Sequence, residues 1–390
     1  MPTRTGLRSL LVAGITAVFA RVFAVAEAYA IAVSVLAALL IAMVSVHLRP
    51  LRLEARRWVE PTTIHAGDRA HLFVEVVNRS RWRNPPVRWL NSAWIPPLKR
   101  NAPKVVTEII DTSRRGQVSL AEGHILHEDP LGLVARTRVV APPTQFMILP
   151  RIAEVAMPVA GAGILGELLM RNAQRLGLGE FDGLREYVDG DDPRSIHWRA
   201  SARSPDLMVR QFTVEGARRC TVVFDRDALA AAIAGPDAFE AAVEIAATLV
   251  VAAEASGLTT RLVISGGADI SGPSISDAAI TALTLVQPGP AIQRLERDGS
   301  DGLGILILVT TAQEFTPARV RAITGDLALV PIRVIVSAPP SQSEGTAAPP
   351  ETISSPQTDP VIRASDLDHF LRVWGSLTHN SSPSRRVPSS

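Results

Sequence analysis

The sequence predicts a multidomain protein: an N-terminal transmembrane helical hairpin, then an immunoglobulin-like antiparallel β-sandwich, then a doubly wound α/β domain. Three observations support this prediction. Residues 1–50 are strongly apolar, residues 51–150 contain short β-rich runs, and residues 219–337 alternate apolar strand-like runs with helical stretches. A chain of 390 residues is long enough for two or three domains that each bury a core.

Residues 1–50 contain two apolar segments that can each cross a membrane. Ala28 to Leu48 is a run of 21 residues without Asp, Glu, Lys or Arg, which spans a hydrocarbon core of about 30 Å as a helix. Leu7 to Ala26 is the weaker span because Arg21 interrupts it, although an arginine near one end can reach the headgroups. A signal peptide is the alternative for this first segment, but no cleavage site with a polar mature start follows it. We therefore expect residues 7–48 to lie in the lipid bilayer.

Arginine residues flank the predicted hairpin at both ends. Arg4 and Arg8 precede it, and Arg49, Arg52, Arg56 and Arg57 follow it. A tight turn at residues 26–28 would bring both clusters to the same side, which the positive-inside rule makes the cytoplasm. The predicted location is the cell membrane, with the bulk of the chain cytoplasmic.

Residues 51–150 are divided by turn-forming residues into roughly seven β-rich runs without a helical period. That spacing is typical of an immunoglobulin-like sandwich, which we expect to act as a spacer. His124 and His127 raise a metal site as an alternative. On a strand these two side chains would point to opposite faces, and no third ligand has a useful spacing.

Residues 151–218 combine an apolar connector with the most densely charged segment of the chain. Acidic residues and arginines alternate from Gly179 to Gln211, a density that is unfavourable in a sheet strand. We expect only the middle of the segment to be helical, after a turn at Gly190–Pro193. The candidate residues for partner docking or for a structural clamp are Gly183, Arg185, Tyr187, Gly190, Asp191, Asp192, Arg194, His197, Trp198, Arg199 and Arg203.

Three interpretations of this segment remain open. As a clamp, its arginines would pair bidentately with carboxylates and fix the segment against the next domain, because the two groups match in geometry. As a docking surface it would bind a protein partner, or an anion through Arg185, Arg194, Arg199 and Arg203. A catalytic interpretation, with His197 as a base near Asp191, lacks a nucleophile or metal in the sequence.

Residues 219–337 predict a parallel sheet with helices on both faces, because apolar strand-like runs are separated by helical stretches. The expected helices are 237–256, with Asp237 as cap, 276–286 and 316–326. The single cysteine, Cys220, opens an apolar run and is expected to be a buried thiol.

The C-terminal region is predicted to contain one further structured element. Residues 338–364 are rich in Pro, Ser and Thr and predict a disordered linker. Residues 365–377 have apolar side chains at helical spacing and predict an amphipathic helix, docked on the α/β domain or on a partner. Residues 378–390 predict a disordered tail.

The runs GLREY, GDDPRSIHWRASAR and VRQF, with DPLGL upstream, resemble the signature of the bacterial domain of unknown function 58 family. The resemblance extends over about residues 50–336 and implies a von Willebrand factor type A-like fold for the α/β domain. That fold commonly binds a divalent metal through Asp-x-Ser-x-Ser, a Thr and a later Asp. Only Asp225, Asp227 and Thr310 remain here as degenerate candidate positions, so we expect neither a bound metal nor another cofactor.

The same resemblance implies a partnership with MoxR-type AAA+ ATPases. The expected function is a membrane-anchored, non-enzymatic interaction or adaptor protein on the cytoplasmic face. One alternative is a metal-dependent hydrolase that uses Asp225 and Asp227, disfavoured by the missing serines and by the lack of a G-x-S-x-G motif. Another is an outward-facing adhesion protein, disfavoured by the arginine distribution. Nucleic acid is not an expected partner, because the net charge is only +2.

Overall fold

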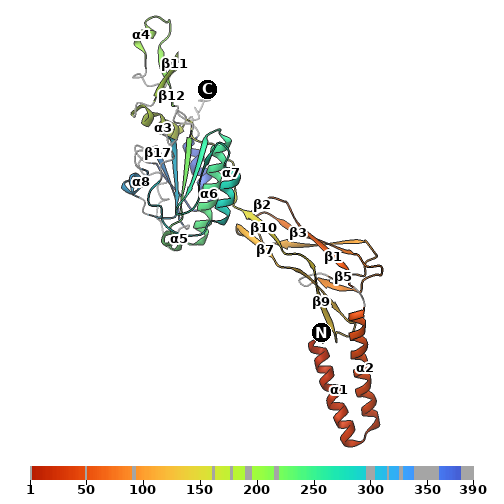
Figure 1. Ribbon diagram of the computed structural model, residues 1–390. Coiled ribbons are helices and arrows are strands. Elements are labelled where there is room, and N and C mark those ends of the chain that lie inside the picture. The colour runs from red at the N-terminus through yellow and green to blue at the C-terminus, as the bar shows by residue number, and fades with distance from the viewer. Residues whose placement is uncertain are drawn as a thin grey trace, which may run out of the picture. The chain divides into compact units, whose positions relative to one another are not determined.

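A computed structural model describes residues 2–48, 51–89, 94–159, 163–175, 179–188, 196–214, 219–295, 304–313, 316–324, 328–337 and 360–378. Contacts along the chain divide it into two compact units, Met1–Ile148 and Leu149–Ser390. Figure 1 shows the elements of each unit with their labels.

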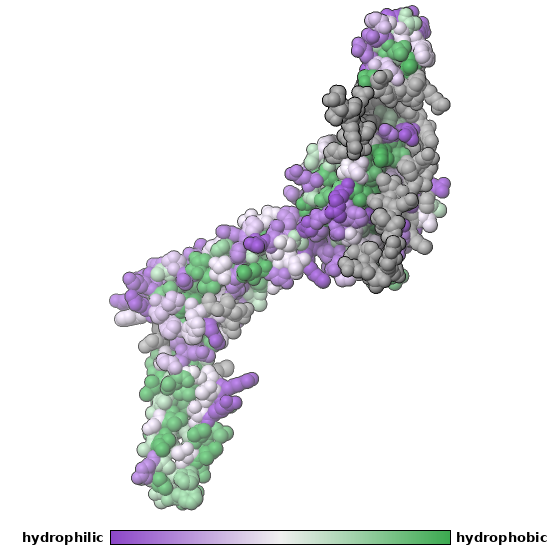
Figure 2. All heavy atoms as spheres, turned by 180° about the vertical axis from the view of Figure 1, so that it is seen from behind, coloured by the Kyte–Doolittle hydropathy of each residue, from purple (hydrophilic) through white to green (hydrophobic). Residues whose placement is uncertain are grey.

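The first unit begins with two helices, α1 (Arg4–Phe23) and α2 (Ala26–Leu48), which are long and apolar enough to cross a membrane. Small residues such as Ala13, Ala20 and Ala32 are buried, whereas the large apolar side chains lie on the outside. In Figure 2, apolar residues make up much of the face of this hairpin that is in view. A small-residue interface with an apolar exterior is typical of helices that pack within lipid. Arg21 lies in the last turn of α1, beside the turn of the hairpin.

The remainder of the first unit is built from short β-strands. They are β1 (Leu53–Glu60), β2 (Ile64–His65), β3 (Ala70–Asn78), β4 (Val87–Trp89), β5 (Trp94–Ile95), β6 (Pro103–Ile110), β7 (Gly116–Leu120), β8 (Gly123–Glu128), β9 (Ala135–Ala141) and β10 (Thr144–Leu149). They form three sheets, ordered β1-β3-β6, β2-β10-β7 and β5-β4-β8-β9. The pairs β1–β3, β3–β6, β4–β8 and β8–β9 are antiparallel. This confirms the β-rich, antiparallel character predicted for residues 51–150.

Alternation along the strands places the core between two of these sheets. Every second residue of β3 is buried, including Val74 and Val76, because successive side chains of a strand point to opposite faces. The same buried cluster contains Trp89 of β4 and Ile125 of β8. The sheets β1-β3-β6 and β5-β4-β8-β9 therefore enclose a common core.

The helical hairpin packs on the turn between β8 and β9. Leu133 and Val134 of this turn form a buried cluster with Ala42 and Val46 of α2. The backbone amide of Thr3 donates to the carbonyl of Leu133 at 2.9 Å. These contacts identify the end of the β-strand region that lies next to the helices.

The second unit contains a six-stranded sheet ordered β15-β14-β13-β16-β17-β18. Its strands are β13 (Arg219–Asp225), β14 (Thr259–Ile264), β15 (Asp269–Gly272), β16 (Gly304–Thr310), β17 (Ala328–Val336) and β18 (Val361–Ala364). Neighbouring strands from β14 to β18 are parallel, and the edge strand β15 is antiparallel to β14.

Helices cover both faces of this sheet (Figure 1). They are α3 (Gly163–Arg175), α5 (Ala228–Ala234), α6 (Pro236–Ala255), α7 (Ser276–Leu285), α8 (Pro317–Thr324) and α9 (Leu367–Thr378). Val222 and Phe224 of β13 pack with α3, α6, α7 and α9, whereas Val223 packs with α8 and the segment around Ile292. Successive side chains of β13 thus pack in two separate cores, one on each face of the sheet, as the predicted doubly wound α/β fold requires.

The predicted helices at 237–256, 276–286 and 316–326 are present as α6, α7 and α8, but the cap of α6 differs from the prediction. Gly235 caps α6 and Pro236 occupies its first position, so Asp237 lies in the first turn instead of capping the helix. The amides of Ile275 and Ser276 at the start of α7 donate to the Glu254 carboxylate of α6 at 2.7 and 2.8 Å. A carboxylate of a neighbouring helix thus caps the N-terminus of α7.

The disordered linker predicted for residues 338–364 is wrong at its end, because residues 361–364 form β18. This four-residue strand pairs with β17. The predicted amphipathic helix follows as α9 and docks on the α/β core, where Phe370 and Trp374 are fully buried. The indole of Trp374 donates to the carbonyl of Ala156 at 2.8 Å. So short a strand carries no signal of its own, and the sheet edge that it completes is formed by distant residues.

Candidate functional site

The charged segment forms a β-hairpin, called the signature hairpin below, from residues 179–188 and 196–214. Strands β11 (Gly179–Glu186) and β12 (Met208–Val214) pair antiparallel in a separate two-stranded sheet. The prediction that this segment would not form strands is wrong. Unlike a strand buried on both faces, a two-stranded ribbon tolerates charged residues such as Arg185 and Glu186, which are exposed.

Polar contacts tie the signature hairpin together around His197. The His197 amide donates to the carbonyl of Met208 at 2.7 Å, and the Ser201 hydroxyl accepts from the Met208 amide at 2.8 Å. His197 caps the short helix α4 (Trp198–Ser201), since its Nδ1 accepts from the Ala200 amide at 3.0 Å. Residues 196–201 are thereby attached to the start of β12.

This arrangement has a chemical consequence for His197. Because Nδ1 accepts a hydrogen bond from a backbone amide, the neutral ring carries its proton on Nε2. The lone pair that a general base would use is therefore engaged within the hairpin. The geometry favours a structural role for this histidine. Asp191, proposed as its catalytic neighbour, lies outside the described residues, as do Gly190, Asp192 and Arg194.

The outer surface of the signature hairpin combines apolar and basic side chains. Trp198 is 67% exposed, and Leu184, Val188 and Leu207 are also exposed. Arg185, Arg199 and Arg203 lie on the surface as well. Within the part of the chain that the structure describes, no ion pair involves Arg199 or Arg203.

The remaining candidates in the hairpin occupy its backbone framework. Gly183 follows an irregularity in β11, where the register shifts between Phe181 and Gly183. Tyr187 is half-buried, and its amide donates to the carbonyl of Leu207 at 2.7 Å, which closes the hairpin beyond the strands.

A second candidate site lies at the carboxyl edge of the parallel sheet, where β13 and β16 end. Asp225 pairs in register with Thr310, at the point where strand order reverses and α/β folds commonly bind ligands. The Asp225 carboxylate accepts from the Thr310 hydroxyl at 3.1 Å and from the Ile292 amide at 2.9 Å. Asp225 is only 1% exposed, and burial raises the pKa of its carboxyl group. Both carboxylate oxygens are engaged by groups of the protein itself.

Asp227 does not join Asp225 and Thr310. Its carboxylate accepts from the amide of Leu229 at 3.0 Å and so caps helix α5. Asp227, and not Asp225, therefore caps the segment that follows β13. The fold therefore brings Asp225 and Thr310 together, whereas Asp227 lies at the N-terminus of α5.

Arg226 closes the same edge of the sheet over β14. Its Nε donates to the carbonyl of Ser265 at 2.6 Å, and a terminal nitrogen donates to that of Gly266 at 2.7 Å. A Cβ atom at Gly289 would lie 2.8 Å from this guanidinium, so the facing loop approaches it closely. The sequence did not predict a role for Arg226 in the fold. Its role was missed because its partners are backbone carbonyls of distant residues.

Neither this edge nor the sandwich offers a set of metal ligands. Among the described residues, no group of three or more His, Cys, Asp or Glu side chains could hold a metal ion. His124 is half-exposed on β8 and contacts the carbonyl of Glu122, whereas His127 is buried on the opposite face of the strand.

Comparison with known proteins identifies one family. The family model described as "Protein of unknown function DUF58" matches residues 183–287. The matched segment starts within β11 and ends just after α7, so it includes most of the signature hairpin and the first half of the α/β sheet. This match supports the predicted resemblance over that segment. No curated protein and no solved structure matches the chain.

Proposed function

We propose that this protein is a membrane-anchored, non-enzymatic adaptor that presents the signature hairpin to a protein partner. The observation that carries this proposal is the exposed surface around Trp198, in which one tryptophan stands 67% exposed among apolar and basic side chains. Trp and Arg are enriched among the residues that dominate binding energy in protein interfaces. The hydrogen bonds at His197 and Ser201 hold this surface in place before a partner binds.

The α/β domain is proposed to have a von Willebrand factor type A-like fold. Support comes from the sheet order β15-β14-β13-β16-β17-β18 with a single antiparallel edge strand, together with the resemblance seen in the sequence. Its carboxyl edge is occupied by internal contacts of Asp225 and Arg226. This favours a docking domain over a metal-dependent hydrolase, because the polar groups of the edge already have partners within the protein.

The sandwich is proposed to be an immunoglobulin-like spacer, and helices α1 and α2 are proposed to insert in the membrane. The apolar exterior of the helical hairpin supports insertion. Arginines on both flanks of the helices support a cytoplasmic location for the two units by the positive-inside rule. The proposed partner is an AAA+ ATPase of the MoxR type, which the family resemblance implies.

Binding of a purified MoxR-type ATPase to the detergent-solubilised full chain tests this proposal. The Trp198→Ala variant and the double variant Arg199→Ala plus Arg203→Ala should each bind about tenfold or more weakly. Their melting temperatures should stay unchanged, because the side chains removed are exposed. Trp94→Ala is the matched control, because Trp94 is 62% exposed on the sandwich, outside the proposed surface.

Three outcomes distinguish the interpretations of the hairpin. Lost binding in folded variants, with binding retained by Trp94→Ala, supports the docking surface. Full binding by the hairpin variants contradicts it. A large fall in melting temperature on replacing Arg199 and Arg203 would instead identify the segment as a structural clamp.

A further inference from the structure

We infer that the end of the β-sandwich next to the helical hairpin is a second membrane contact, which binds anionic lipid headgroups. This inference rests on the proposed insertion of α1 and α2. It concerns loops 79–86 and 96–102, called the juxtamembrane loops, which lie outside the segment matched by the family model. Strand register, surface chemistry and loop rigidity each support it.

Strand register places the first loop at the helix end of the sandwich. Helix α2 ends at Leu48 and β1 begins at Leu53, so this end of β1 adjoins the hairpin. Leu53 pairs with Asn78, the last residue of β3. Loop 79–86 therefore leaves the sheet at the end where the chain arrives from α2.

The second loop meets the first at the same end. Pro103, the first residue of β6, pairs with Val77, so loop 96–102 enters the sheet beside Asn78. The turn between β8 and β9, which packs on α2 through Leu133, belongs to this end as well. If α1 and α2 span a bilayer, the juxtamembrane loops face its headgroups.

The side chains on these loops suit an anionic membrane surface. Trp82 is 72% exposed and is flanked by the exposed residues Arg81 and Arg83. Lys99 and Arg100 are exposed on the second loop. Tryptophan is enriched at membrane–water interfaces, and juxtamembrane Lys and Arg are attracted to anionic lipids. The combination fits a headgroup layer that is negative at its surface and apolar just beneath.

Buried asparagines hold the loops in a defined shape. Asn78 is fully buried, and its Nδ2 donates to the carbonyls of Trp82 and Leu98, both at 2.9 Å. Its Oδ1 accepts from the Ser80 amide at 2.8 Å, and Asn84 accepts from the Leu98 amide at 2.7 Å. The exposed tryptophan is thus displayed by an ordered loop, so little conformational entropy is lost when it contacts lipid.

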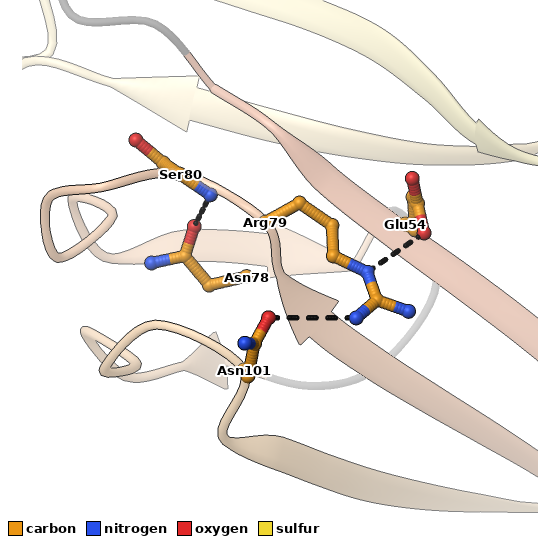
Figure 3. Close-up of polar contacts among 5 residues, drawn as sticks. All are labelled: Glu54, Asn78, Arg79, Ser80 and Asn101. Carbon is orange, nitrogen blue, oxygen red and sulfur yellow. Dashed lines mark hydrogen bonds and ion pairs between the residues drawn. The ribbon is translucent and has the colours of Figure 1, made fainter.

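Glu54, an acidic residue on β1 at this end, is neutralised by a neighbouring arginine. Figure 3 shows Arg79 between Glu54 and Asn101, with Asn78 and Ser80 beside it. The Arg79 Nε lies 3.0 Å from the Glu54 carboxylate, and a terminal nitrogen lies 3.4 Å from Asn101 Oδ1. Glu54 therefore does not offset the positive charge of Arg81, Arg83, Lys99 and Arg100. Lipid is the favoured occupant of this face because the proposed anchor brings a bilayer to it.

An environment-sensitive fluorophore on a Trp82→Cys variant of the full chain tests this inference. The native Cys220 is fully buried, so the parent chain serves as the labelling control. A Ser113→Cys variant is the matched control, because Ser113 is exposed beyond the end of β6 that lies away from the helices. The proteins are reconstituted in phosphatidylcholine vesicles with or without phosphatidylglycerol, and quenching by lipids with brominated acyl chains is measured.

The label at position 82 should shift to shorter wavelength and be quenched in vesicles that contain phosphatidylglycerol, whereas the label at 113 should show neither effect. Adding Arg81→Glu and Arg83→Glu should abolish most of the quenching. A label at 82 that behaves like the label at 113 would overturn the inference. Equal quenching without phosphatidylglycerol, unaffected by the two charge reversals, would overturn its anionic-lipid part. A spectral shift of the label at position 82 on addition of RNA, without quenching by the brominated lipids, would assign this face to nucleic acid.

Resistance of the protein to alkaline carbonate extraction separates this inference from the proposed function. If the chain resists extraction and the label stays silent, only the lipid-contacting loops are disproved. If the chain is extracted, the proposed membrane anchor fails, and the inference fails with it.

Discussion

The carboxyl edge of the α/β sheet and the signature hairpin use charged residues in opposite ways. At the sheet edge, Asp225 and Arg226 bond to groups of the same domain. On the hairpin, Arg199 and Arg203 stand on the surface beside an exposed Trp198. The first region therefore stabilises the fold, whereas the second is the surface that we propose binds a partner.

This contrast shows that position in a fold does not by itself identify a site. Parallel sheets commonly bind ligands at their carboxyl edge, and this sheet has an acidic residue there. Its carboxylate has two internal donors, so a ligand would have to displace contacts that hold the domain together. The hairpin lies outside that sheet but carries exposed residue types that are common in interfaces.

The largest expected effect compares a buried tryptophan with an exposed one. Trp374→Ala should lower the free energy of unfolding of the α/β domain by about 3–5 kcal/mol, because it leaves a cavity between α9 and the core. Trp198→Ala should change it by less than about 0.5 kcal/mol. Hydrogen exchange of the amides of β13 in the full chain measures both values. Similar effects of the two variants would remove the distinction between the regions.

A smaller effect is expected at Asp225. Asp225→Ala leaves the Ile292 amide and the Thr310 hydroxyl without their acceptor, which should cost about 1–3 kcal/mol. Asp225→Asn should cost less because an oxygen remains to accept from Ile292. The same exchange measurement distinguishes the two variants. If Asp225→Ala proved as stable as the parent chain, the edge would not be a structural element.

Asp225 should also make stability depend on pH. Burial raises the pKa of its carboxyl group, so the folded chain holds this proton more tightly than the unfolded chain. The contribution of Asp225 to stability is therefore greatest at low pH. It falls as the pH rises from the ordinary aspartate range of about 3.9 up to the raised folded value. The Asp225→Asn variant should lack this part of the decline.

A local effect is expected in the signature hairpin. His197→Ala removes the cap of α4 and should raise the free energy of that local structure by about 0.5–2 kcal/mol. His197→Asn should retain most of the cap, because Asn also accepts from a backbone amide. Exchange of the Ala200 and Met208 amides reports the change, and exchange in β13 should be unaffected. A change in β13 would show that the hairpin is coupled to the sheet.

The smallest effect concerns the thiol at the start of the sheet. Burial raises the pKa of Cys220 to about 12, so almost no thiolate is present at neutral pH. A thiol reagent should leave the folded chain unmodified and react fully after unfolding. Rapid labelling of the native protein would show that β13 opens readily, contrary to its buried position.

Patterns within short stretches predicted most of the architecture. The uninterrupted run Ala28–Leu48 predicted α2, and alternation of apolar and polar residues predicted strands such as β3. Apolar runs separated by helical stretches predicted the parallel sheet. These signals are local, since each depends on residues within one or two turns or along one strand.

Partners that are distant in sequence escaped prediction. The role of Arg226 depends on the carbonyls of Ser265 and Gly266, and the cap of α7 depends on Glu254. The strands of the signature hairpin were missed because their charges were judged against a buried sheet, whereas Arg185 and Glu186 are exposed on a two-stranded ribbon. Residues 189–195 of the same signature lie outside the described residues.

By itself, the sequence determined most of the segments that form helices and strands, because apolar periodicity and turn residues act over short distances. It also determined that the N-terminal helices are long and apolar enough for a membrane. Only the tertiary structure decided that Asp225 is enclosed while Trp198 is displayed, and that Trp82 shares an end of the sandwich with the helices. The physical reason is that burial, strand register and hydrogen-bond partners depend on which distant segments meet.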